Sequence, residues 1–365
     1  MKSTGSISLP RLLLKTLLLF TALNFLFAFI PPAALGRLTL YNTLFPGRPR
    51  LPYGDTALSY NVSLFNLDAM FASHQLAGVP KPADEYRVIL IGDSSVWGFL
   101  LTPAQTLDAY LNAANVTTPN GKTLRAYNLG YPTLSLLKDL LILQRALAYE
   151  PDLIIWLTTL EAFPYEKQLA SPLVENNPHA TRTLLATFNL QPSTFIPHPS
   201  SFWDRTLLRQ RRPVADLLRF QLYGVLWSAT GIDQYYPPTY NLRAEDLEPD
   251  NTFYNLPNPL TPDTLAFDIL HAGLDIAGEI PILLVNEPIF LSTGKNSDIR
   301  YNFYYPRWAY DQYRALLAAD MAQRGAHYLD LWNAIPNAEF TNTAIHLSPT
   351  GSQQLAEEIL SALSP

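Results

Sequence analysis

The stretch EYRVILIGDSSVWGFLL, residues 85–101, is an apolar strand that runs directly into a polar turn. Its core shows no alternation of polar and apolar residues, as in a strand buried on both faces of a parallel sheet. Gly92 permits a tight turn after the strand, and Ser94 then opens a helix, where free backbone N–H groups can hold an oxyanion. An ordinary helix cap by Asp93 or Ser95 explains the same residues, so the turn alone does not establish a nucleophile.

The rest of the chain repeats this change from strand to helix. Apolar strands are predicted at five places, and helical periodicity fills most of the intervals between them and the chain beyond the last one. The strands are 86–92, 124–130, 151–159, 279–287 and 326–335, and the helices are 102–115, 134–150, 306–325 and 348–363. This order predicts an α/β fold in which helices cover both faces of a parallel sheet, with sites beyond the carboxyl ends of the strands.

The N-terminal segment has the pattern of a signal peptide or a signal anchor. Lys2, Arg11 and Lys15 precede an uncharged apolar run at residues 16–30. A full helical span takes about 20 residues, which the run reaches if it starts at residue 12 and Lys15 snorkels. No convincing cleavage site follows, so we predict an uncleaved signal anchor over a cleaved peptide, with a buried soluble helix as the remaining alternative.

The segment boundaries follow from composition. Residues 1–35 are the predicted transmembrane anchor, and 36–84, rich in Pro, Gly, Asn and Tyr, form an extended neck. The predicted catalytic domain covers 85–365, and a Pro-rich insertion or cap without strand rhythm occupies about 164–278. We place the domain outside the cytoplasm, on a single-pass anchor in the cell membrane.

Charge and cysteine content exclude several classes of function. With a net charge of −6 over 365 residues, the chain lacks the basic field that draws nucleic acid, so no nucleic-acid partner is expected. The one basic cluster, residues 205–213, favours a solvated helix face over a binding patch. The absence of cysteine excludes disulfides, a thiolate nucleophile and Cys-ligated zinc. We expect neither a metal nor a cofactor.

Two further segments end in polar residues where a site is expected. Gly130, after the second strand, places its backbone N–H near the first serine, with Asn128 bracing the turn; a plain strand-ending glycine is the alternative. His346 stands just before a helix that Ser348 caps and Pro349 opens. Its near-neutral pKa suits it to take a proton from a serine hydroxyl.

Together these blocks resemble the SGNH (GDSL-type) superfamily of hydrolases and acyltransferases. VILIGDSSVWGFLLTPAQTLDAYL is similar to its first block, AYNLGYPTLSLLKDLLIL to its second, and AIHLSPTGSQQLAEEI to its last. The resemblance implies a three-layer α/β/α sandwich, with Ser94 as nucleophile and His346 as base. It also implies an oxyanion hole made by the backbone N–H groups of Ser94 and Gly130.

The sequence departs from that family at two positions. Glu161 stands where members place an oxyanion-binding asparagine, and Thr158, Thr159 or a residue of the insertion are the alternatives for that role. The aspartate that orients the histidine is missing, and residues 340–346 offer only Asn342 or Thr343. We name Asn342 as the orienting residue and leave open whether Glu161 or Glu287 supplies an acid.

Two hypotheses on function follow. The first is a membrane-anchored esterase or O-acyltransferase that acts on acyl esters of cell-envelope or exopolysaccharide carbohydrates, similar in this respect to alginate O-acetylation and D-alanyl-lipoteichoic-acid proteins. The resemblance then implies a multi-pass membrane protein as acyl donor. The aromatic loop at 286–313 suits sugar recognition or, equally, internal packing. The second hypothesis is a non-catalytic carbohydrate-binding or assembly protein with the same fold.

Overall fold

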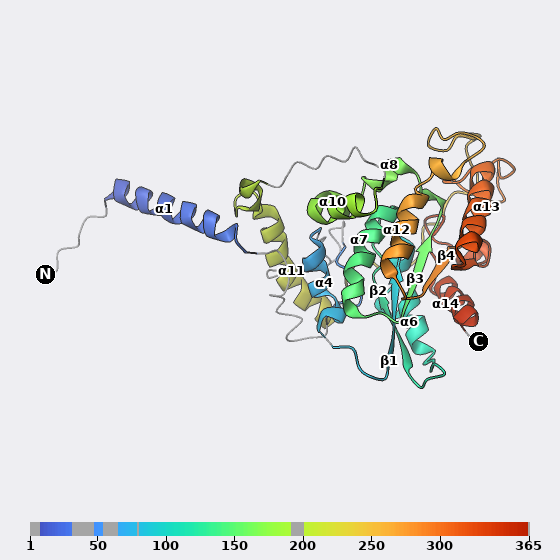
Figure 1. The fold of residues 1–365 in the computed structure, drawn as a ribbon, viewed down its shortest axis with the longest axis horizontal. Coiled ribbons are helices and arrows are strands. Elements are labelled where there is room, and N and C mark those ends of the chain that lie inside the picture. The colour runs from blue at the N-terminus through green and yellow to red at the C-terminus, as the bar shows by residue number, and fades with distance from the viewer. Residues whose placement is uncertain (1–7, 31–46, 54–64, 79, 191–200, 364–365) are drawn as a thin grey trace.

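The sheet defines the fold of the computed structural model, which describes residues 8–30, 47–53, 65–78, 80–190 and 201–363 (Figure 1). In this part of the chain five strands form one sheet in the order β2-β1-β3-β4-β5, and every neighbouring pair is parallel. The strands are β1 (Glu85–Ile91), β2 (Thr123–Asn128), β3 (Leu153–Thr158), β4 (Ile282–Asn286) and β5 (His327–Asp330). The predicted parallel sheet is confirmed, and its order reverses between β1 and β3, where parallel sheets place their sites.

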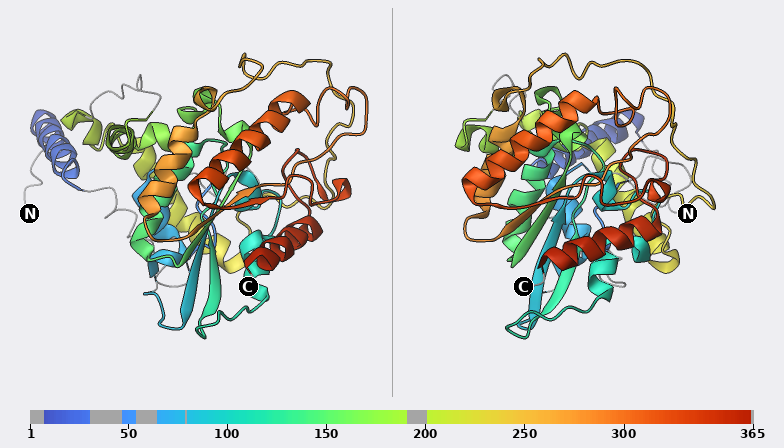
Figure 2. Two further views of the ribbon diagram at one scale, coloured as in Figure 1. Left: turned by 45° about the vertical axis from the view of Figure 1, so that its right-hand side comes forward. Right: turned by 90° about the vertical axis from the view of Figure 1, so that its right-hand side faces the viewer.

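Helices cover both faces of the sheet, which makes the protein a three-layer α/β/α sandwich (Figure 2). Successive strand residues point to opposite faces, so Trp156 and Ile155 belong to different apolar cores. One core is closed by α7 (Leu136–Ala146), α12 (Phe267–Ala277) and α13 (Arg307–Arg324). The other is closed by α6 (Leu107–Ala113) and α14 (Pro349–Leu363). The fold implied by the sequence blocks is therefore the fold observed.

The α12 helix lies inside the predicted insertion at 164–278, yet it belongs to the sandwich. It packs beside α7, and a Cβ added at Gly273 would come within 2.3 Å of the Trp156 ring. A glycine lets the helix approach β3 this closely. The other elements of that segment add no strand to the sheet: α8 (Tyr165–Gln168), α9 (Pro172–Asn176), α10 (Pro178–Thr187), η5 (Phe202–Arg205), α11 (Arg211–Thr230) and η6 (Pro262–Thr264). The limits of the insertion remain a prediction.

The N-terminal helix α1 (Leu9–Phe27) projects away from the sandwich (Figure 1). It is long and apolar enough to cross a membrane, a property that signal sequences share. Of the predicted anchor, residues 1–7 and 31–35 lie outside the described residues, as do 36–46, 54–64 and 79 of the predicted neck. The described neck holds α4 (Leu67–Ser73) and η1 (Gln75–Gly78).

Short helices fill the connections of the sandwich. Two of them, α5 (Ser94–Trp97) and η4 (Leu160–Ala162), follow β1 and β3 directly and so mark the edge where the strand order reverses. The others are η2 (Pro103–Gln105), η3 (Leu147–Tyr149) and η7 (Asn337–Glu339). Residues that α5 and η4 carry therefore lie at the edge of the sheet where a site is expected.

Candidate active site

The turn after β1 is so tightly packed that its first residue, Gly92, has no room for a side chain. A Cβ at Gly92 would lie 2.5 Å from a Val96 methyl and 3.0 Å from the Leu157 carbonyl oxygen, so only glycine fits. Asp93 then caps α5, since its Oδ1 accepts from Ser95 N at 2.7 Å. The cap and the tight turn place Ser94 at the first position of α5, partly exposed to solvent.

Ser94 is in direct contact with the histidine that the sequence singled out. His346 Nε2 lies 2.7 Å from Ser94 Oγ, and His346 Nδ1 lies 2.9 Å from Asn342 Oδ1. An amide oxygen only accepts hydrogen bonds, so Nδ1 carries the proton and donates it to Asn342. The Nε2 lone pair is then free to accept the Ser94 hydroxyl proton. Ser94, His346 and Asn342 can thus act as nucleophile, base and orienting residue, and each lies within hydrogen-bond distance of the next.

The loop that carries His346 is held by its own polar residues. Thr343 Oγ1 accepts from His346 N at 3.1 Å, and Thr341 N donates to the His346 carbonyl at 2.8 Å. Beyond it, Ser348 Oγ accepts from Gly351 N at 3.1 Å, which confirms the predicted cap of the last helix. A rigid base needs fewer rearrangements to reach the serine proton, and this loop supplies that rigidity.

Burial sets the protonation state of His346. Its side chain is only 7% exposed, and the Phe99 ring lies 5.0 Å from the imidazole ring. Desolvation disfavours the imidazolium and lowers the pKa of His346 to about 4. At neutral pH the imidazole is therefore uncharged and able to accept a proton. The amide of Asn342, unlike a carboxylate, adds no charge to stabilise the imidazolium that forms.

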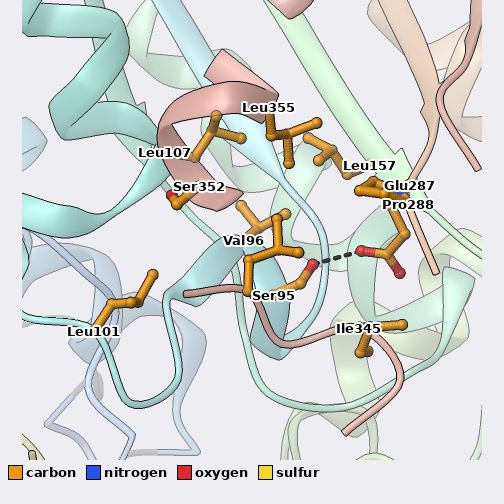
Figure 3. A pocket seen from close by; sticks show the side chains of 11 residues that line it. Ser95, Val96, Leu101, Leu107, Leu157, Glu287, Pro288, Ile345, Ser352 and Leu355 are labelled. Carbon is orange, nitrogen blue, oxygen red and sulfur yellow. Dashed lines mark hydrogen bonds between the residues drawn. The ribbon is translucent and has the colours of Figure 1, made fainter. Parts of the chain in front are cut away.

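Ser95, the residue after the nucleophile, forms a separate hydrogen bond with a buried acid. Ser95 Oγ donates to Glu287 Oε2 at 2.5 Å, and the two line a cavity of about 10 Å³ (Figure 3). Burial, and then the nearby charge of Asp93, raise the pKa of Glu287 well above its ordinary value. Glu287 thus favours its protonated form. The cavity has room for about one water and is too small for an acyl chain.

Neither of the two acids named as candidates contacts His346. Glu287 is bonded to Ser95, and Glu161 accepts from Tyr254 and lies 2.8 Å from Lys167 Nζ. The Glu161 side chain is buried and carries a nearby counter-charge, so its carboxylate is paired inside the fold. The residue that touches the imidazole is Asn342, as the sequence suggested.

The predicted oxyanion donors differ in availability. The Ser94 N–H makes no hydrogen bond to any described residue, and it adjoins the nucleophile. The Gly130 N–H, in contrast, donates to Asn128 Oδ1 at 3.0 Å. Asn128 also donates to the Val96 carbonyl at 2.7 Å, which confirms its bracing role. A Cβ at Gly130 would lie 2.4 Å from Trp97 N, so this glycine lets β2 pack against α5, and its amide is not presented as a free donor.

Residues distant in sequence hold the loop after α5, and no sequence pattern pointed to them. Arg50 from the neck donates to the carbonyls of Gly98 at 2.9 Å and Leu101 at 3.0 Å, and it pairs with Asp233. Gln234 accepts from Leu100 N at 2.8 Å, at a residue whose φ of 69° is strained for leucine. The neck and the segment after α11 thus support the loop that follows the nucleophile helix. No local pattern marks a buried arginine inside a Pro-rich segment.

The aromatic loop at 286–313 is mostly packed inward. Tyr301 and Tyr305 are buried, and Tyr301 donates to Asp311 Oδ1 at 2.7 Å. Phe303 is 42% exposed and Tyr304 is half-buried. Internal packing therefore accounts for most of this cluster. Phe303, Tyr304 and Trp308 are the aromatic residues of the loop that keep some surface exposed to solvent.

No protein-family model and no curated protein matches the chain. Among solved structures, it is similar to a member of the lipolytic protein G-D-S-L family from Veillonella parvula, with 10% identity over 75% of this chain and 96% of that chain, and a TM-score of 0.36. It is also similar to a carbohydrate acetylesterase from Sinorhizobium meliloti, with 14% identity over 76% and 99% of the two chains and a TM-score of 0.34. The first of these two structures is described as a member of the G-D-S-L family, the family that the sequence blocks resemble.

Proposed function

We propose that the protein is a serine esterase or O-acyltransferase that acts on acyl esters of cell-envelope or exopolysaccharide carbohydrates. The observation that carries the proposal is the line from Ser94 Oγ through His346 to Asn342, with contacts of 2.7 and 2.9 Å. A serine that only begins a helix has no need of a buried, uncharged histidine on its hydroxyl. Both residues come from segments that the fold holds rigidly at the carboxyl edge of the sheet.

The geometry supports acyl transfer in two steps. Ser94 Oγ attacks the acyl carbon while His346 Nε2 takes the hydroxyl proton, and the Ser94 N–H donates to the developing oxyanion. The tetrahedral intermediate then collapses, and His346 returns the proton to the departing alcohol oxygen. Water or a sugar hydroxyl attacks the acyl-enzyme by the same route in reverse. Hydrolysis and transfer differ only in which of the two arrives first.

The proposed place of action is the extracytoplasmic side of the cell membrane, where envelope polysaccharides are found. What supports it is α1, a helix long and apolar enough to serve as an uncleaved anchor. We further propose a multi-pass membrane protein as acyl donor, since an activated acyl group made inside the cell must cross the bilayer to reach Ser94.

The test uses the full chain in detergent and its Ser94→Ala variant. Release of p-nitrophenol from acetyl and butyryl esters is measured with and without oligosaccharide acceptors, and a fluorophosphonate probe is mapped by mass spectrometry. We expect turnover and probe labelling at Ser94 in the wild-type chain only. An acylated oligosaccharide product selects transfer over hydrolysis. Equal turnover by two folded proteins would rule out a Ser94 mechanism.

A second candidate is a carbohydrate-binding or assembly protein without catalysis. Two observations favour it: His346 has an amide instead of a carboxylate partner, and the Gly130 amide is occupied by Asn128. This candidate predicts no probe labelling at Ser94 and saturable binding of an oligosaccharide, measured by calorimetry, that the Ser94→Ala variant retains.

A further inference from the structure

The α11 helix carries two apolar stripes, and only one of them faces the protein. Phe220 and Trp227 are buried and pack on the Arg48 guanidinium at 5.2 and 4.9 Å from their ring centres. On another face, Leu218, Leu222 and Leu226 recur every four residues and are 66, 63 and 38% exposed. A helix in water normally hides its apolar residues on one face, so the open stripe indicates a contact outside the chain.

The segment before α11 touches the end of the apolar helix α1. Phe25 of α1 stacks on Phe202 with ring centres 5.4 Å apart and lies 5.8 Å from Trp203. Asn24 Oδ1 accepts from Leu208 N at 2.8 Å. If α1 crosses a bilayer, its last turn lies at the headgroup level, and these contacts hold η5 at the same depth. The 63% exposed Trp203 then stands where interfacial tryptophans are found.

Charge on this segment has the sign that an anionic surface attracts. Residues 201–230 contain five arginines and two aspartates, in a chain whose net charge is −6. All five arginines are exposed: Arg205, Arg209, Arg211, Arg212 and Arg219. In the helix, Arg211 and Arg219 lie on the same side as Leu218 and Leu222, by the 3.6-residue repeat. Apolar residues flanked by arginine are typical of helices that lie in the plane of a membrane surface.

We infer that the exposed face of η5 and α11 docks on the anionic lipid headgroups of the membrane that α1 enters. This face consists of Trp203, Leu208, Leu218, Leu222 and Leu226 with the five arginines. α11 lies on the side of the sandwich toward α1 (Figure 1). The inference rests on the proposed anchoring by α1. A domain attached at two points is fixed in orientation, and Asp233, just beyond α11, ties that orientation through Arg50 to the loop after Ser94.

Because the chain contains no cysteine, a single introduced cysteine carries the only thiol-reactive label and reports on that position alone. Full-length Leu222→Cys, Leu18→Cys and Glu358→Cys variants carry an environment-sensitive dye in nanodiscs of phosphatidylcholine, with or without phosphatidylglycerol. Spin-labelled lipids then quench dyes at the bilayer. Leu18 lies within α1, and Glu358 is exposed on α14. We expect strong quenching at 18, quenching at 222 that rises at least about threefold with the anionic lipid, and none at 358.

Each other outcome overturns the inference and shows where it fails. Quenching at 18 with none at 222 keeps the anchor and refutes docking of α11. If the dye at position 222 becomes shielded from water in detergent as the protein concentration rises, the face belongs to a contact with a second copy of the chain. No quenching at 18 refutes the anchor and, with it, the docking. An Arg211→Gln/Arg212→Gln variant must lose the effect of anionic lipid at 222 while ester turnover, measured in detergent, stays unchanged, which separates this inference from the proposed chemistry.

Discussion

Ser94 and Ser95 are adjacent, identical in chemistry and both bonded to a titratable side chain, yet their surroundings differ. Ser94 faces an imidazole whose lone pair accepts its proton, on a partly exposed edge of the sheet. Ser95 faces Glu287, a carboxyl group that burial and Asp93 hold toward its protonated form. A protonated acid cannot take a proton. The comparison shows that the partner's protonation state, set by its surroundings, separates a nucleophile from a structural hydroxyl.

The largest effect is expected from removing each serine hydroxyl in turn. Ser94→Ala deletes the attacking oxygen and should lower kcat by about 10³-fold or more, as in other serine enzymes. Ser95→Ala removes only a support of the turn and should keep kcat within about tenfold of wild type. Ester turnover of both variants checks this, with circular dichroism to confirm folding. Similar losses in the two variants would mean that the two serines act as one unit.

The next effect concerns the residue behind the imidazole. Asn342→Asp replaces an amide by a carboxylate of the same shape and supplies the charge that stabilises imidazolium. We expect kcat to rise by about tenfold or more, since the opposite replacement in a serine protease lowers it by about 10⁴-fold. Asn342→Ala, which removes the orienting group, should lower kcat. An unchanged rate in both variants would show that Asn342 does not act on His346.

The pH dependence of kcat/KM tests the low pKa of His346. The base works only when unprotonated, so activity should fall as the pH drops through about 4, instead of through the ordinary value near 6.5. In Asn342→Asp the acidic limb should move to higher pH, because a carboxylate favours the charged imidazole. An acidic limb near 6.5 in the wild-type chain would show that the histidine is more solvated than the fold indicates.

The same pKa shift bears on folding stability. Because the folded state lowers the pKa of His346, the unfolded chain binds a proton first as the pH falls below about 6.5. Stability is then lost progressively between about 6.5 and 4. His74 is buried with a pKa that burial also lowers to about 4, so His346→Gln should reduce this loss without abolishing it. Thermal unfolding between pH 4 and 8 measures the difference.

The smallest effect is expected at Glu287. Glu287→Gln keeps a polar group on Ser95 and removes the carboxyl group, so kcat at neutral pH should stay within about threefold. Since the folded state raises the pKa of Glu287, the wild type should lose stability as the pH rises through that pKa, and the variant should lose less. Melting temperatures at rising pH measure this. A loss of activity as large as in Ser94→Ala would assign Glu287 a part in the chemistry.

Local pattern predicted much of the fold and the pair at its centre. The apolar runs at 85–91 and 153–158 are strands because uniformly apolar segments of this length bury both faces in a parallel sheet. Ser94 and His346 were found because each stands beside a helix start with a recognisable cap. Asn342 was found because the family that the sequence blocks resemble places the orienting residue shortly before the histidine, and it does contact His346.

Gly130 shows where such reasoning stops. The family resemblance implied that its backbone N–H is an oxyanion donor, whereas in the structure this N–H donates to Asn128. The requirement for glycine comes from the backbone of Trp97, a contact between two segments. A sequence pattern can show that a position requires glycine, but the segment that packs against it determines why glycine is required.

Helices, strands and their caps depend on interactions within a few residues, so the residue order contained the alternating elements and the two segments that carry Ser94 and His346. The contacts between distant segments follow from how those elements pack. Arg50 meets Asp233 from 183 residues away, and Ser95 meets Glu287 from 192. The burial of His346, the raised pKa of Glu287 and the open face of α11 likewise depend on which surfaces lose contact with water when the chain folds. Desolvation is a property of the assembled core, and no short stretch of residues encodes it.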